Sequence, residues 1–283
     1  MVAERKVQRH TQSQPTLEGA GVYLHRALGF DEVPIFDPFL LLDDFRADDP
    51  DRYLAGFPWH PHRGIETITY VLEGMVEHGD SMGNQGVIGP GDVQWMTAGS
   101  GIVHQEMPHG DLEGRMYGFQ LWANLPATDK MMPPRYRDIK AAQIPEVIMP
   151  GGVRVKIICG RVGDAVGPVR DIVTDPEYLD VTVPSGATFE HPVMLGHTLF
   201  AYLIGGSGLF GATETLAKNR DLLLFDDGEL LRVTAKTDQD VRFLLISGLP
   251  LAEPVAWRGP IVMNTREELA TAFREYREGT FIK

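Results

Sequence analysis

Two short segments of the sequence carry side chains of the kinds that bind metal ions. The first is His60-Pro61-His62, and the second, 42 residues after His62, is His104-Gln105-Glu106. In an extended strand, residues two positions apart project from the same face, so each segment presents two potential ligands to one side. If the two strands pair or face each other, three imidazoles and one carboxylate converge.

This donor set favours a particular group of ions. Three neutral nitrogens and one oxygen suit a divalent transition metal: Fe, Mn, Co, Ni, Cu or Zn. A closed structural zinc site normally uses cysteine, and the chain has one cysteine, which lies near neither segment. Four protein ligands on an octahedral ion leave two positions open, as O2 or a bidentate oxygen ligand requires. The pattern therefore favours small-molecule chemistry at a metal.

The elements that must position these ligands read as β-strands. Short runs such as ETITYVLEG, VRVKIICG and VRFLLISG are rich in Val, Ile, Thr, Phe and Tyr and alternate with glycine and proline turns. Their regular spacing predicts antiparallel sandwiches or barrels. Enough glycines lie between the two segments to fold one back beside the other: Gly83, Gly86, Gly89, Gly91, Gly99 and Gly101.

The two halves of the chain can be laid over each other. TITYVLEG at 67–74 matches LFAYLIGG at 199–206 with an offset of 132, and GDVQWMTA at 91–98 matches GELLRVTA at 228–235 with an offset of 137. Five inserted residues account for the change in offset. The repeat predicts two copies of one small β-barrel.

The end of the chain reads clearly as a helix. Thr265 and Glu268 form a capping-box pattern, an apolar stripe follows, and Gly279 occupies the position that usually ends a helix. We expect this helix to dock on a β-domain.

Composition narrows the classes of function. The chain has 39 acidic and 26 basic residues, and a net charge of −13 argues against direct nucleic-acid binding. No apolar run approaches the roughly 20 residues of a membrane span, and the first residues lack a signal-peptide pattern. We therefore expect a soluble, cytoplasmic protein without a disulfide framework, and a monomer.

Longer motifs around the candidate ligands resemble those of a known family. The stretch that runs from HPHRGIETITYVLEG to GDVQWMTAGSGIVHQEMP is similar to the first-domain signature of the pirin family, and PFLLLDDF, FQLWANLP and GPIVMNTREEL extend the resemblance over nearly the whole chain. The family's iron ligands fall on His60, His62, His104 and Glu106, so the resemblance implies one divalent metal ion, Fe(II) before Cu, Mn, Co, Ni or Zn.

The resemblance also implies the fold. Pirins are all-β proteins with two tandem cupin domains, each a jelly-roll β-barrel, and here a C-terminal α-helix follows. We expect an N-terminal metal-binding cupin domain over 1–135 and a C-terminal cupin domain over 150–283 that includes the helix.

The second half is expected to hold no metal. Under the two offsets, the four ligand positions correspond to residues that are poor ligands or cannot bind a metal: Pro192, Met194, Val241 and Phe243. We expect His191 and His197 to be packed or surface histidines.

Other residues could support the site. Glu66 lies an even number of residues from His60 and His62, so on a continuous strand it would face the same side. It could lie behind the ligands as a further carboxylate. A group of apolar residues could wall a pocket for a flat aromatic substrate, although each could equally belong to the barrel core: Trp59, Trp95, Met96, Phe119 and Trp122.

The resemblance leaves two functions open. Some members resemble quercetin 2,3-dioxygenases, which cleave a flavonol with O2, and we favour this activity on a flavonol or similar aromatic enol. Here Glu106 would be both ligand and general base, because it is the one anionic ligand able to take the enol proton. Eukaryotic pirins are instead described as iron-binding, redox-responsive transcriptional coregulators, which are not enzymes and act through protein partners.

Overall fold

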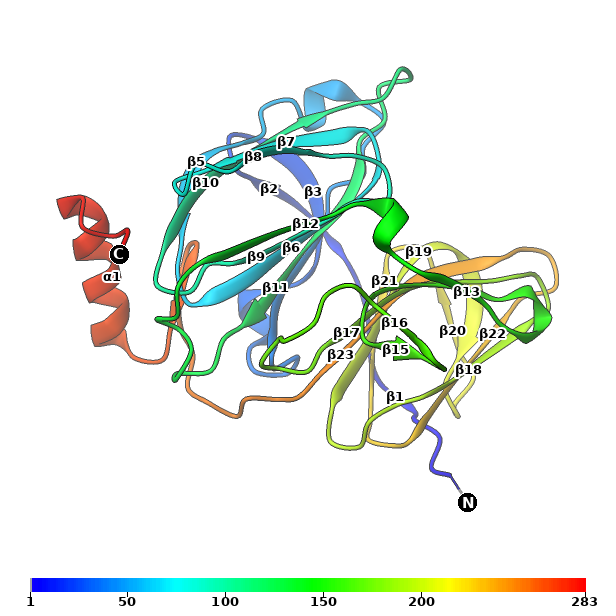
Figure 1. Ribbon diagram of the computed structural model, residues 1–283. Coiled ribbons are helices and arrows are strands. Elements are labelled where there is room, and N and C mark those ends of the chain that lie inside the picture. The colour runs from blue at the N-terminus through cyan, green and yellow to red at the C-terminus, as the bar shows by residue number, and fades with distance from the viewer. Residues whose placement is uncertain (1) are drawn as a thin grey trace. The chain divides into compact units, whose positions relative to one another are not determined.

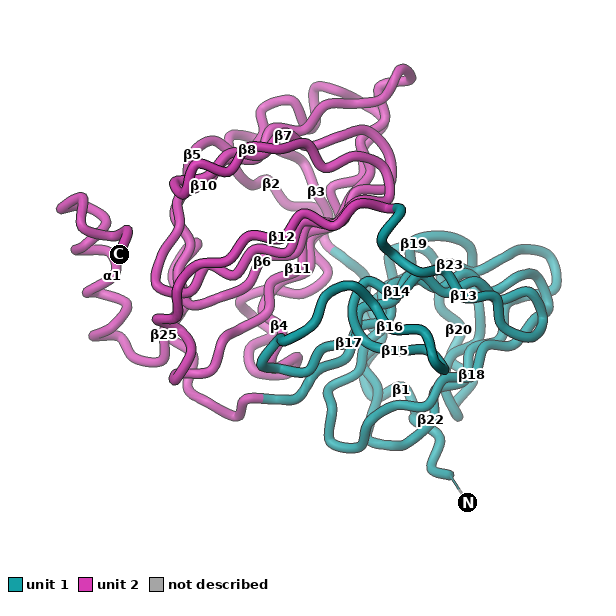
Figure 2. Tube along the Cα trace, viewed as in Figure 1, with its two compact units in different colours: residues 1–13, 142–250 teal, residues 14–141, 251–283 magenta. Residues whose placement is uncertain are grey.

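The computed structural model describes residues 2–283 and divides them into two compact β units, which Figure 2 draws in separate colours. One unit combines residues 14–141 with 251–283. We call it the histidine unit, because it contains the segments of His60 and His104. The second unit combines residues 2–13 with 142–250.

The histidine unit consists of antiparallel strands and the C-terminal helix (Figure 1). Its elements are β2 (Gln14–Glu18), β3 (Val22–Leu28), β4 (Phe39–Asp44), β5 (Phe57–His62), β6 (Ile65–Glu73), β7 (Met75–Asp80), β8 (Gln85–Ile88), β9 (Val93–Thr97), β10 (Ile102–His109), β11 (Tyr117–Asn124), β12 (Arg135–Ile139), β24 (Ala256–Arg258), β25 (Ile261–Met263) and α1 (Arg266–Glu278). The larger sheet has the order β12-β9-β6-β11-β4-β3-β2, and the smaller has the order β5-β10-β7-β8.

Side-chain alternation assigns the faces of these sheets. Along β10, Ile102, His104, Glu106 and Pro108 are buried, whereas the residues between them are partly exposed. This period-two pattern is typical of a strand with one face on a core. The polar pair His104 and Glu106 therefore points into the interior of the unit.

The second unit is also antiparallel. Its strands are β1 (Val7–Gln12), β13 (Glu146–Ile148), β14 (Arg154–Cys159), β15 (Arg161–Val162), β16 (Ala165–Val166), β17 (Glu177–Val183), β18 (Thr188–Pro192), β19 (Thr198–Phe210), β20 (Thr215–Lys218), β21 (Asp221–Phe225), β22 (Leu230–Ala235) and β23 (Val241–Gly248). The main strand order is β1-β21-β19-β23-β17-β14-β13, and β18 and β20 join through β22 and β19. Its core is a cluster of Val, Leu, Ile and Phe side chains from most of these strands.

The structure agrees with the internal repeat. Tyr70 lies in β6 and Tyr202 in β19, and the glycines that follow them at matching positions, Gly74 and Gly206, both have positive φ angles, of 74° and 67°. A Cβ atom at either glycine would lie within 2.6 Å of a backbone oxygen, so both positions require glycine. The expected all-β fold of two β domains with a C-terminal helix is confirmed.

The expected helix is also present. Thr265 caps α1 by accepting a hydrogen bond from the Glu268 backbone, Glu268 returns one to the Thr265 backbone, and Gly279 ends the helix with a φ of 73°. Within residues 2–283, neither α1 nor any shorter helical turn has the length and apolar character needed to cross a membrane.

The compact units differ from the expected ranges 1–135 and 150–283 at both ends of the chain. Strand β1 pairs with β21 and so joins the unit formed by the second half of the chain. The C-terminal segment 251–283, with α1, packs in the histidine unit (Figure 2). At the N-terminal end the physical reason is strand pairing, because β1 satisfies its backbone hydrogen bonds on β21. In the C-terminal segment β24 and β25 pair with each other, and the Val262 backbone N–H donates to the Arg63 carbonyl of the histidine unit.

Candidate metal centre

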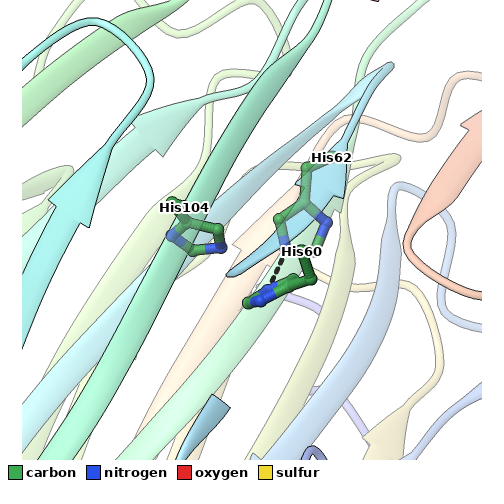
Figure 3. A group of neighbouring side chains, drawn as sticks. All are labelled: His60, His62 and His104. Carbon is green, nitrogen blue, oxygen red and sulfur yellow. Dashed lines mark hydrogen bonds between the residues drawn. The ribbon is translucent and has the colours of Figure 1, made fainter. Parts of the chain in front are cut away.

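Strands β5 and β10 bring the two ligand segments together. They pair antiparallel, with His104 directly opposite His60 and Ile102 opposite His62. The three imidazole rings lie close to one another beside these paired strands (Figure 3). One nitrogen from each of His60, His62 and His104 lies within 4.8 Å of the other two, a spacing that could hold one metal ion.

Backbone carbonyls fix the orientation of two of the rings. His60 Nδ1 donates to the Pro58 carbonyl and His62 Nδ1 to the Pro260 carbonyl, each at 2.9 Å. Because a carbonyl oxygen only accepts, Nδ1 carries the proton in each neutral ring and Nε2 presents a lone pair. Metal-binding histidines commonly show this arrangement, in which the non-ligating nitrogen donates to an oxygen.

The lone pairs of these two rings face each other. The Nε2 atoms of His60 and His62 lie 3.1 Å apart, at the dashed line in Figure 3. Two neutral rings protonated on Nδ1 cannot form a hydrogen bond there, so the lone pairs repel. A cation bound by both nitrogens removes that repulsion.

His104 gives a second, independent indication. Its ring is fully buried, and neither Nδ1 nor Nε2 has a hydrogen-bond partner within the described part of the chain. Buried polar atoms are almost always bonded, and a metal ion is a suitable missing partner for one of the two nitrogens. The residues present therefore fit a divalent transition metal.

Burial also sets the protonation of the cluster. Desolvation lowers the pKa of His62 and His104 well below the usual value, and the charges of neighbouring histidines lower both further. The pKa of His60 is lowered too, again mainly by burial. All three imidazoles are therefore neutral near pH 7, which is the form that binds metal ions.

Glu106 lies beside this cluster but outside the group of three converging nitrogens. Its Oε1 accepts a hydrogen bond from Thr69 Oγ1 at 2.8 Å, and its Oε2 accepts one from Gln120 Nε2 at 3.0 Å. A register shift between His104 and Glu106 places the glutamate opposite Phe57 of β5. Burial raises the pKa of Glu106 to about 7, although the two hydrogen bonds oppose the rise. Its role as fourth ligand stays a prediction.

A cavity of about 660 Å³ opens beside the histidines. His60, His62 and Glu106 line it together with Thr69 and Gln120, two residues that the sequence analysis did not single out. Much of the remaining wall is apolar or aromatic: Val22, Leu24, Leu41, Phe45, Phe57, Trp122 and Trp257. The volume is typical of a site for a small organic molecule.

Of the aromatic candidates, Trp122 lines this cavity. Phe119 and Trp95 are buried in the core, and Trp59 is 52% exposed. Strand alternation explains the difference on β11, where Gln120 and Trp122 face the cavity and Phe119 points to the opposite face. Met96 is also a buried core residue.

Glu66 does not lie behind the ligands. It accepts a hydrogen bond from Thr97 Oγ1 at 2.6 Å, whereas Thr69 on the same strand faces the cavity. Counting alternate residues onward from His62 gave the wrong face for Glu66. Gly64, with a φ of 79°, lies between β5 and β6 and interrupts the alternation.

The C-terminal segment holds the end of β5 in place. Arg63, which follows His62 and is almost fully buried, donates to the Ser100 and Phe281 carbonyls and to Glu275 Oε2 at distances of 2.7 to 2.9 Å. Pro260 of the same segment accepts the His62 hydrogen bond. The sequence motif GPIVMNTREEL therefore contributes a backbone acceptor to the site.

We expect Arg63→Met to destabilise the histidine unit by about 3 kcal/mol, because the change removes a buried, charge-assisted network. The midpoint of urea unfolding, followed by tryptophan fluorescence, measures the effect. Arg115→Met is the matched control, since the ion pair of Arg115 with Asp111 is partly exposed and should contribute little. Equal midpoints for the two variants would contradict this role of Arg63.

In the second unit, the positions that correspond to the ligands have other roles. Val241 and Phe243 of β23 are buried in the apolar core. His191 Nε2 bonds the Glu177 carboxylate at 2.9 Å, and the ring stacks on Phe189. His197 is buried. The expectation that this unit binds no metal stays a prediction.

The fold and the site together define a protein of two cupin domains in which one domain carries a three-histidine site able to hold a metal ion. Family comparison gives the same result: the model described as pirin matches residues 21–123, and the model described as the pirin C-terminal cupin domain matches residues 178–282. The chain belongs to the pirin family.

Individual relatives match over almost the full length. The chain is 47% identical over 279 residues to a pirin-like protein of Caulobacter vibrioides, covering 98% of this chain and 99% of the relative. It is 45% identical over 276 residues to a Pseudomonas aeruginosa protein provisionally named a quercetin 2,3-dioxygenase, covering 95% of each. The crystal structure of a quercetin 2,3-dioxygenase from Acinetobacter baumannii superposes with a TM-score of 0.90 at 31% identity, covering 99% of both chains.

Proposed function

We propose that this protein is a metal-dependent dioxygenase that cleaves a flavonol, or a similar aromatic enol, with O2. The observation that carries the proposal is the convergence of three histidines, two of which, His60 and His62, line a cavity with largely apolar sides. The names of the Pseudomonas and Acinetobacter relatives support the same reaction class. We propose Fe(II) as the ion, held by His60, His62, His104 and Glu106.

The protein residues have distinct roles in this proposal. The three histidines are neutral and hold the ion, and Glu106 accepts the proton of the substrate enol. Thr69 and Gln120 hold the Glu106 carboxylate on the cavity wall. The apolar side chains exclude water and stack on a flat ring system. A bound divalent transition ion supplies Lewis acidity and one-electron chemistry toward O2.

The reaction has a defined balance. In flavonol cleavage both atoms of O2 enter the organic product, two ring carbon–carbon bonds break, and the carbon between them leaves as carbon monoxide. One O2 is therefore consumed and one carbon monoxide released for each flavonol.

We expect protein loaded with Fe(II) to consume quercetin and O2 in equal amounts and to release carbon monoxide. An oxygen electrode, quercetin absorbance and gas analysis measure the three quantities, and parallel samples loaded with Cu, Mn, Co, Ni or Zn identify the active ion. The metal-free protein is the control. Absence of coupled O2 uptake with every ion would contradict the proposal.

The alternative is a redox-responsive coregulator without enzymatic activity. A protein partner retained in only one oxidation state of the metal, together with no O2 uptake, would favour that function. A monomeric state and a cytoplasmic location also stay predictions from the sequence.

A further inference from the structure

A row of polar side chains crosses the floor of the cavity. Thr69 on β6 lies opposite Gln120 on β11, Gln120 lies opposite Asp43 on β4, and Asp43 lies opposite Arg26 on β3. All four line the cavity. Neighbouring strands are about 4.8 Å apart, so three steps place Thr69 and Arg26 about 14 Å apart.

The two ends of this row carry different chemistry. At the histidine end, Thr69 and Gln120 both donate to the Glu106 carboxylate. At the far end, Arg26 donates to both oxygens of Asp43, at 2.8 and 2.7 Å, and Arg26 Nη1 lies 2.8 Å from Glu18 Oε1. Glu18 also lines the cavity. The far end therefore offers a guanidinium and two carboxylates.

This far end can make further hydrogen bonds. A guanidinium has five N–H donors, and three of those of Arg26 are used by Asp43 and Glu18. Each carboxylate oxygen can accept more than one hydrogen bond. Phenolic hydroxyl groups, which both donate and accept, match such a cluster.

Apolar positions flank the polar row. Trp122 and Leu41 face each other two residues along from Gln120 and Asp43, and Leu24 lies two residues before Arg26 on the same face of β3. All three line the cavity. A narrow polar stripe between apolar flanks suits a flat aromatic molecule with polar groups at both ends.

We propose that Arg26, Asp43 and Glu18 form a specificity subsite that binds the hydroxyl groups on the ring of the substrate farthest from the histidines. The inference rests on the proposed function, because that function places the substrate enol at the histidine end of the row. It narrows the substrate class to flavonols, or similar enols, that carry hydroxyl groups on the distal ring.

Binding of three flavonols tests the subsite without turnover. The ligands carry no, one or two hydroxyl groups on the distal ring, as in galangin, kaempferol and quercetin. Quenching of tryptophan fluorescence reports occupancy, since Trp122 and Trp257 line the cavity. Measured without O2, the dihydroxylated ligand is expected to bind at least about tenfold more tightly than the unsubstituted one, as a hydrogen bond to a charged group would give. Equal affinities in the unmodified protein would overturn the proposal.

Two variants assign the discrimination to these residues. Arg26→Met combined with Asp43→Leu removes both members of this partly buried ion pair and is expected to bring the ratio of the affinities for the dihydroxylated and unsubstituted ligands close to one. Glu18→Gln changes a side chain that is 41% exposed, leaves the pair intact, and is expected to reduce the ratio a few-fold. Arg115→Met is the control with an unchanged ratio. A ratio retained in Glu18→Gln and in a folded double variant would overturn the assignment.

The binding experiment separates this inference from the proposed reaction. If discrimination holds while no flavonol is consumed with any metal, the subsite stands and the dioxygenase proposal fails. If flavonols are consumed but bind with equal affinity, the reaction stands and the subsite fails.

Discussion

His104→Ala is expected to remove the metal ion from the protein, from one ion per chain to almost none after dialysis. His104 supplies one of three converging nitrogens, and neither nitrogen of its buried ring has a hydrogen-bond partner in the described part of the chain. Loss of a residue that only orients a ligand typically lowers metal affinity 10- to 100-fold, so loss of a ligand should exceed about 100-fold. Elemental analysis and competition with a chelator measure both quantities.

Histidines of the second unit provide the controls for this experiment. His191→Ala and His197→Ala should keep full metal content, because His191 bonds Glu177 and neither residue belongs to the converging group. His60→Ala should behave like His104→Ala. Equimolar metal in both His60→Ala and His104→Ala would refute the site, and loss of metal in His197→Ala would show that the second unit takes part.

The convergence of the histidines was predictable because it follows from local chemistry and strand parity. His60 and His62 are two residues apart and so project from one face of their strand. His104 and Glu106 have the same spacing on β10, and both lie on its interior face. The ends of α1 were predictable for the same reason, since Thr265 and Gly279 carry their own capping signals. Such features need no knowledge of distant parts of the chain.

Other parts of the site depend on backbone groups that have no signature in the sequence. The Pro260 carbonyl orients His62 across 198 positions of sequence. Strand β1 joins β21 through backbone pairing that many sequences could form. Glu66 failed as a candidate because a single glycine with positive φ, Gly64, resets the alternation on which its parity was counted. Long-range pairing and strand interruptions therefore limited the prediction.

The polar row on the cavity floor shows the same limit more sharply. Arg26 and Asp43 are 17 residues apart, and Gln120 lies far from both in sequence. Each residue alone reads as an ordinary polar strand position. Only the register of β3, β4 and β11 aligns them, and register depends on which strands pair.

Glu106→Gln is expected to lower activity per bound metal by about 10²- to 10⁴-fold, the usual effect of losing a general base. The substitution keeps the size of the side chain and an oxygen donor but removes the negative charge. The local hydrogen bonds can persist, because the new amide oxygen can accept from Gln120 Nε2 and the amide nitrogen can donate to Thr69 Oγ1. The fold should therefore survive, and a loss of activity reports on chemistry.

Metal content must be matched for this comparison, since a neutral amide oxygen attracts a dication less strongly than a carboxylate does. Three histidines should still retain part of the ion, so activity is divided by the metal measured in each sample. Glu66→Gln is the matched control, because Glu66 is also a buried carboxylate but bonds Thr97 on the side away from the cavity. Unchanged activity per metal in Glu106→Gln would mean that Glu106 balances charge at the ion without accepting the substrate proton.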